Sequence, residues 1–186
     1  MYITGISRML KQGRLHLNTV LNRIEIDYKD GIFIPYLEIA PSDWGLVYEK
    51  YVGQVLEDEG YTITYRGLEL GLMDQGIDLT AQKENSVLFI QCKYQTQKLT
   101  KSRIEWILQK ASKLLLERHA KYGQKVTFML VVNNLNDNFS KRIPKDFNFG
   151  LVSSNKVVYP LLEYFLSHNR TQDKVKLDVR EIEMVI

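Results

Sequence analysis

The most constraining feature of the sequence is a pair of strand-like segments with polar residues where a buried sheet is expected. The segments IDLTAQ (77–82) and SVLFIQCKY (86–94) are joined by KENS, a composition typical of turns. The second segment is apolar enough to lie inside a sheet, yet it contains Gln91 and Lys93. The sequence therefore predicts an antiparallel hairpin whose polar residues need an explanation.

The register of this hairpin brings its polar residues together. With KENS as a four-residue loop, Gln82 lies opposite Val87, and counting back along the strand places Asp78 opposite Gln91. Lys93 shares the face of Gln91, because side chains alternate between the two faces of a strand. A shift of one residue would scatter these side chains. We therefore expect a carboxylate, an amide and an ammonium group at one end of the hairpin.

These residue types suit metal-assisted hydrolysis of a phosphodiester. An uncompensated charge in a packed face is costly, so the groups are expected at an open edge with a ligand or with one another. Glu49, on the flank of the preceding helix, can supply a second carboxylate. Two carboxylates and a backbone carbonyl suit Mg²⁺, and Lys93 can stabilise an oxyanion or activate water. Two simpler alternatives remain: an ion pair between Asp78 and Lys93, and an exposed helix position for Glu49.

The rest of the chain predicts alternating helices and strands. In order, the other elements are a helix at 41–60, a strand at 61–66, a glycine-punctuated loop at 67–76, a helix at 101–122, a buried strand at 126–133, a short strand near Leu151 and a helix from Pro160. The hairpin makes two neighbouring strands antiparallel, and the helix at 101–122 allows a parallel crossover. A mixed sheet with helices on both faces, an α/β fold, is the natural packing.

The two ends of the chain are expected to lie outside this domain, which spans 42–170. Residues 1–41 form an N-terminal extension, with a short helix and a strand pair formed by RIEIDY and IFIPYLEI. Residues 171–186 form a strand-like C-terminal tail. Either end can provide a homodimer interface, and the extension can also contact DNA.

Composition excludes several classes of protein. The chain has one cysteine, Cys92, and three histidines far apart in sequence, so neither a disulfide framework nor a multi-cysteine zinc site is expected. No apolar run approaches the length of a membrane span, and the first residues lack the apolar core of a signal peptide. We therefore expect a cytoplasmic protein that does not bind membranes.

Positive charge is concentrated after the hairpin. From Lys93 to Lys125 there are nine Lys or Arg residues against two Glu, although the net charge of the chain is only +3. Such a block can neutralise phosphates and release counterions, but it is also compatible with a solvated helix face. The candidate nucleic-acid contacts are Gln95, Lys98, Lys101, Arg103, Lys110 and Lys113.

These motifs resemble a known family of nucleases. The segments MDQGIDLT and SVLFIQCKY, preceded by YEKYVGQVLEDEGY, are similar to the PD-(D/E)xK nuclease superfamily, and most closely to its Mrr-like restriction endonuclease branch. Members show a helix glutamate, a D-x-G-x-D segment and a Q-x-K strand end. The resemblance covers roughly residues 42–135 and implies a restriction-endonuclease-like α/β/α core with a central mixed sheet.

The resemblance also implies roles for individual residues. Asp78, Glu49 and the backbone carbonyl of Cys92 match metal ligands. Gln91 stands where many members carry a metal-binding Glu, so it is a further candidate for metal contact, and Lys93 matches the catalytic lysine.

Asp74 matches the first acid of D-x-G-x-D and is a further candidate for contact with nucleic acid. The implied cofactor is Mg²⁺ or Mn²⁺, and the implied substrate is duplex or branched DNA. The expected function is a Mg²⁺-dependent DNA endonuclease. The alternatives are a nuclease similar to Holliday-junction resolvases and a non-cleaving nucleic-acid-binding module on the same fold.

Overall fold

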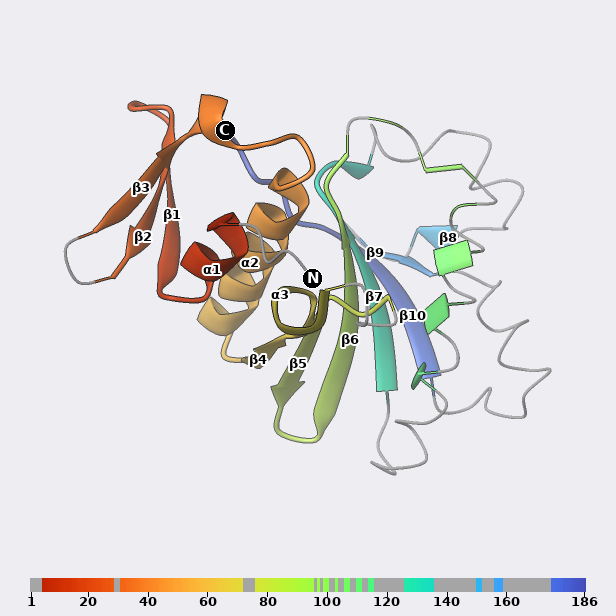
Figure 1. The fold of residues 1–186 in the computed structure, drawn as a ribbon. Coiled ribbons are helices and arrows are strands. Elements are labelled where there is room, and N and C mark those ends of the chain that lie inside the picture. Colours follow the sequence, from red (N-terminus) through yellow and green to blue (C-terminus); the bar gives the residue numbers. More distant parts are fainter. Residues whose placement is uncertain are drawn as a thin grey trace.

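The structure is a computed structural model, and it forms two sheets separated by a long helix (Figure 1). It describes residues 5–28, 31–71, 76–95, 97, 99–100, 103, 106–107, 110–111, 114–115, 126–135, 150–151, 156–158 and 175–186. In the described part of the chain, no helix is both long enough and apolar enough to cross a membrane.

The N-terminal extension contains a small antiparallel sheet. Its elements are α1 (Gly5–Leu10), β1 (Arg14–Asn18), β2 (Arg23–Asp27), β3 (Ile32–Pro35) and the 3-10 helix η1 (Tyr36–Glu38). The strands lie in the order β1-β2-β3. The predicted short helix and strand pair are present. The sequence reading missed β1, which pairs with β2 from Arg14 opposite Asp27 to Asn18 opposite Arg23.

The large sheet has seven strands in the order β4-β5-β6-β7-β10-β9-β8 among the described residues. Its elements and adjoining helices are α2 (Trp44–Asp58), β4 (Thr62–Tyr65), α3 (Arg66–Leu70), β5 (Leu79–Lys83), β6 (Ser86–Lys93), β7 (Val126–Val132), β8 (Gly150–Leu151), β9 (Lys156–Val158) and β10 (Val175–Glu181). β7 runs parallel to both β6 and β10, and the other pairs are antiparallel. The predicted α/β fold with a mixed sheet is thus confirmed.

The β5–β6 hairpin has the predicted register but a shorter turn. Gln82 lies opposite Val87, as expected. Lys83 also pairs with Ser86, so the turn contains two residues rather than the four of KENS. Glu84 adopts a φ of 50°, the left-handed conformation that closes such a tight turn. Removing one residue from each side of the loop leaves the register unchanged.

The segment expected to be a loop at 67–76 begins with a helical turn. Residues 66–70 form α3, and Leu68 is buried at 5% exposure. Burial of this leucine against the core favours the helix over the open loop that the glycines suggested. Residues 72–75, and with them Asp74, lie outside the described residues.

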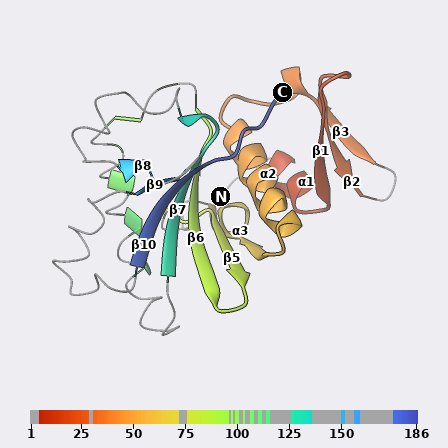
Figure 2. The same ribbon diagram turned by 180° about the vertical axis from the view of Figure 1, so that it is seen from behind.

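The helix α2 covers one face of the large sheet, and described residues of the segment after the hairpin lie on the other (Figures 1 and 2). On one face α2 buries Val47, Tyr48, Val52 and Leu56 in a core shared with Leu79, Ala81, Leu88, Ile90, Met129 and Val131. Residues 103, 106–107, 110–111 and 114–115 belong to the segment predicted as a helix at 101–122, and they are its described part. Its described residues are helical, and Ile107, Ala111, Leu114 and Leu115 are buried. The Oγ1 of Thr100 accepts the N–H of Arg103 at 3.3 Å, a contact typical of a helix start. The structure therefore has the expected three layers.

The C-terminal segment is part of the sheet and of the core. β10 lies inside the sheet, between β7 and β9. Beyond it, the Tyr48 hydroxyl donates to the Ile182 carbonyl at 2.8 Å, and the Met184 N–H donates to Asn133 Oδ1 at 2.7 Å. Ile182 and Met184 are both buried in the core on the α2 side. The segment expected to be a C-terminal tail, residues 171–186, therefore contributes a strand to the same sheet as residues 42–170.

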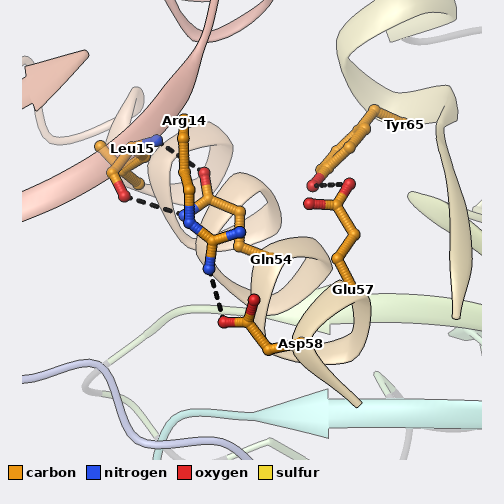
Figure 3. Close-up of polar contacts among 6 residues, drawn as sticks. All are labelled: Arg14, Leu15, Gln54, Glu57, Asp58 and Tyr65. Carbon is orange, nitrogen blue, oxygen red and sulfur yellow. Dashed lines mark hydrogen bonds and ion pairs between the residues drawn. The ribbon is translucent and has the colours of Figure 1, made fainter. Parts of the chain in front are cut away.

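A buried glutamine attaches the N-terminal sheet to α2 (Figure 3). The Oε1 of Gln54 accepts the N–H of Leu15 at 2.6 Å, and its Nε2 donates to the Leu15 carbonyl at 2.8 Å. Both residues are buried, at 5% and 3% exposure. Nearby, Arg14 forms an exposed ion pair with Asp58 at 2.5 Å. The amide of Gln54 thus takes the place of a neighbouring strand at the edge of β1.

Candidate active site

Asp78 lies directly before β5, and its side chain continues the hydrogen bonding between β5 and β6. Its N–H donates to the Ile90 carbonyl at 2.8 Å. Continuing the hairpin register places Asp78 opposite Gln91, so this acceptor lies one residue earlier in β6. Its Oδ2 accepts the N–H of Cys92 at 2.6 Å and the Nε2 of Gln91 at 2.5 Å. The carboxylate therefore replaces a backbone acceptor for β6. This replacement accounts for a carboxylate with only 3% exposure at the end of a strand.

Gln91 links two oxygen atoms of the site. Its Nε2 lies 2.5 Å from Asp78 Oδ2 and 3.4 Å from the Cys92 carbonyl oxygen. The side chain is buried at 6% exposure. Because an amide nitrogen donates hydrogen bonds, this contact orients Asp78 and brings its carboxylate close to the Cys92 carbonyl.

Glu49 reaches the site through a gap left by a glycine of α3. A Cβ atom at Gly67 would overlap with Glu49 Oε2 and would lie 3.1 Å from Glu49 Cδ and 3.5 Å from Asp78 Cα. The N–H of Gly67 also donates to the Asp78 carbonyl at 2.8 Å. The absence of a side chain at Gly67 therefore allows the carboxylate of α2 to approach the start of β5.

The pKa of Cys92 reports the charge around the site. Burial raises the pKa of this thiol well above its ordinary value, and the negative charges of Asp78 and Glu49 raise it further. The positive charge of Lys93 opposes this shift. Asp78, Glu49 and Lys93 thus set the electrostatic surroundings of Cys92, and the thiol stays neutral.

Lys93 lies at the end of β6 and is half-buried. Its partner across the parallel pair is Val132 of β7. Among the salt bridges between described residues, none joins Lys93 to Asp78. The alternative that these two residues form a simple ion pair is therefore not observed. The site instead combines a carboxylate held by hydrogen bonds with an ammonium group two positions beyond Gln91.

Lys110 connects the opposite helix to the hairpin. A Cβ atom at Gly76 would lie 3.1 Å from Lys110 Cδ and 3.3 Å from Gln91 Oε1. Gly76 has a φ of +79°, which favours glycine and allows this close approach. The aliphatic part of Lys110 therefore passes beside the turn that leads to Asp78.

The other candidate contacts for nucleic acid are only partly described. Arg103 is exposed on the same helix as Lys110. Gln95 is half-buried, and its Nε2 donates to the Gln97 carbonyl at 2.9 Å, so this side chain supports a local turn. The candidates outside the described residues are Asp74, Lys98, Lys101 and Lys113.

Two features of the site were not predicted from the sequence. Gly67 was assigned to a loop, because a glycine in GLELG is typical of a turn and nothing local indicates its contact with Glu49 on another helix. The second is Trp106, which is 46% exposed and for which the sequence indicates no role in the site. Within the described residues, no three or more His, Cys, Asp or Glu side chains gather closely enough to hold a metal ion.

The fold and the site define the class of protein. A mixed sheet packed against α2, with Asp78 and Gln91 in contact at the end of a hairpin and Lys93 two positions further along β6, is a restriction-endonuclease-like α/β fold. The Mrr catalytic family model, described as a restriction endonuclease, matches residues 47–150, which is more than half of the chain. The chain therefore belongs to this family of restriction endonucleases, as the sequence motifs indicated. A comparison with curated proteins gave no significant match.

Proposed function

We propose that this nuclease is a Mg²⁺-dependent DNA endonuclease that hydrolyses phosphodiester bonds. The proposal rests on two observations at one end of the β5–β6 hairpin: Gln91 Nε2 contacts both the Asp78 carboxylate and the Cys92 carbonyl, and the Glu49 carboxylate lies beside Gly67, next to Asp78. The segment that matches the restriction endonuclease family contains all three residues.

The residues present fit a hard divalent cation. Two carboxylates and a carbonyl provide only oxygen ligands, which Mg²⁺ and Mn²⁺ prefer over the nitrogen and sulfur ligands that suit zinc. Mg²⁺ usually keeps several water ligands and needs few protein groups, so a small donor set suffices. The space at Gly67 that holds the Glu49 carboxylate supports this assignment. When bound, the cation supplies Lewis-acid polarisation of the scissile phosphate.

Gln91 acts on this site as a positioning residue. Its amide nitrogen, which cannot ligate a cation, faces both Asp78 Oδ2 and the Cys92 carbonyl oxygen. Its Oε1 lies on the side of Gly76 and Lys110. We therefore assign Gln91 to orienting the two oxygen ligands, in place of the direct metal contact expected from the sequence.

Lys93 acts on the phosphate and on water. Its ammonium group donates hydrogen bonds to the oxygens on which charge builds in the transition state, and it orients the attacking water molecule. No ion pair with Asp78 competes for this role among the described salt bridges. The basic residues after the hairpin, including Arg103 and Lys110, hold the DNA backbone.

The proposal is tested by incubating the protein with plasmid, linear, methylated, branched and single-stranded DNA in the presence of Mg²⁺ or Mn²⁺. We expect cleavage of at least one DNA that stops with EDTA. Lys93→Ala should lower the cleavage rate by about 10²–10⁴-fold, the usual contribution of a general acid or base, while divalent-cation binding persists. Cleavage that is unchanged in Lys93→Ala, or that persists in EDTA, would contradict the proposed mechanism.

A further inference from the structure

An exposed tryptophan on the helix that follows the hairpin has two cations over its ring. The Trp106 side chain is 46% exposed. The guanidinium carbon of Arg103 lies 4.3 Å from the centroid of its ring, and the Nζ of Lys110 lies 5.4 Å from it. Spacings of three and four residues place the three side chains on one face of the helix. The adjacent residue Ile107 is buried. The group formed by Arg103, Trp106 and Lys110 is called the Trp106 platform below.

The Trp106 platform adjoins the candidate active site. Lys110 belongs to both, because its ammonium group lies over the Trp106 ring while its Cδ lies beside Gly76, next to Gln91 Oε1. Gln91 points to the face of the sheet opposite α2, since its neighbours Ile90 and Cys92 pack in the core on the α2 side. The platform therefore lies on the same side of the sheet as Gln91.

The chemistry of the platform suits a nucleobase on a DNA strand. The half-exposed Trp106 ring and the guanidinium plane that lies over it are both surfaces on which a base can stack, and the flanking cations attract a polyanion. Within the described residues, Arg103 takes part in no salt bridge that would neutralise it. Bases stack on aromatic side chains and on guanidinium planes in proteins that bind single strands. A base within an intact duplex already has stacked neighbours on both sides, so the platform suits an unpaired one.

We propose that the Trp106 platform binds an unpaired nucleobase of the DNA strand whose phosphate lies at Asp78 and Lys93. This inference rests on the proposed function, and it names the substrate class of that site: DNA with a frayed, bulged or flipped nucleotide near the cleavage position. Phosphate contacts by Arg103 and Lys110 alone are the competing explanation, and they require no stacking on Trp106.

The test measures DNA binding in EDTA, so that no cleavage is needed. Trp44 is the other tryptophan, and Trp44→Phe leaves Trp106 as the fluorophore. The probes are a short DNA duplex and the same duplex with a central unpaired bubble. We expect the bubble to quench Trp106 fluorescence more strongly. We also expect Trp106→Ala to weaken binding of the bubble by about 5- to 150-fold, the contribution of one base–aromatic stack, with little effect on the duplex. Trp106→Phe, which keeps a smaller ring, should lie between.

A matched control is available on the N-terminal sheet. Arg23 lies 4.5 Å from the ring centroid of Phe33, which is 57% exposed, but Arg23 is paired with Glu25 at 2.7 Å. Phe33→Ala removes a similar exposed ring and should leave both affinities unchanged.

Three outcomes would overturn the inference. Equal quenching by both probes, or an equal loss of affinity for both in Trp106→Ala, would overturn it and leave the DNA nuclease intact. Absence of binding to either probe by the parent protein would overturn it together with the proposed action on DNA.

Discussion

Gly67→Ala should weaken metal binding without unfolding the protein. The added methyl group would overlap with Glu49 Oε2 and lie 3.1 Å from Glu49 Cδ. Carbon atoms pack best at about 3.5–4.0 Å, so the carboxylate has to move by roughly 0.5–1 Å. Metal–ligand distances tolerate only about 0.2 Å. We therefore expect divalent-cation affinity to fall by about 10- to 100-fold, the range found when the groups that orient a ligand are lost.

The stability of this variant is expected to change little. Gly67 lies in α3, where alanine is favoured over glycine by about 0.5–1 kcal/mol. Rotation of the Glu49 side chain away from its preferred conformer costs about 0.5–1.5 kcal/mol, which offsets that gain. Thermal unfolding should therefore resemble that of the parent protein, and loss of function cannot be attributed to loss of fold.

The assay is calorimetric titration with Mn²⁺ together with DNA cleavage. Gly45→Ala is the matched control, because Gly45 lies in α2 and a Cβ there meets nothing within 4 Å. This control should bind metal and cleave like the parent protein. A folded Gly67→Ala protein with normal metal affinity would refute the assignment of Glu49 as a ligand.

Three other substitutions or treatments test particular contacts. Gln54→Leu leaves the buried N–H and carbonyl of Leu15 without partners. It should lower the free energy of unfolding, measured by urea denaturation, by about 2–5 kcal/mol. Asp58→Ala breaks an exposed ion pair and should lower it by under about 1 kcal/mol. Gln91→Glu places a second carboxylate against the first, so thermal stability should fall in EDTA and recover with Mg²⁺; equal stability in both buffers would contradict this. Because burial raises the pKa of Cys92, the folded protein should resist iodoacetamide at mildly alkaline pH and should react once it is unfolded in urea. Rapid labelling of the folded protein would contradict this, because it would show that the thiol is accessible.

The hairpin was predictable because its information is local. Alternation of apolar and polar residues fixed which side chains share a face, and the register of Gln82 opposite Val87 followed from the position of the turn. The turn has two residues instead of the four that were predicted, but the register is the same, because Lys83 and Ser86 add one further pair next to Gln82 and Val87. The proximity of Asp78 to Gln91 was therefore available from the sequence.

Contacts between distant elements were not predictable in the same way. The space that admits Glu49 depends on how α3 packs against α2, and GLELG by itself is typical of a turn. β1 is attached through the side chain of Gln54, a residue that looks like any polar position of a helix. β10 was read as part of a tail because its partner β7 lies far away in the sequence, and no local pattern identifies a parallel neighbour.

The most direct test of a metal-dependent nuclease site at the hairpin is divalent-cation binding by the parent protein and by Asp78→Asn, measured by calorimetry. Asp78 uses a single oxygen, Oδ2, to accept both Cys92 N–H and Gln91 Nε2, so asparagine retains an oxygen for these bonds while it removes the ligand charge. We predict that the parent protein binds Mn²⁺ and cleaves DNA, and that both properties fall together in a folded Asp78→Asn protein. Unchanged metal binding and cleavage in Asp78→Asn would contradict the assignment of this site.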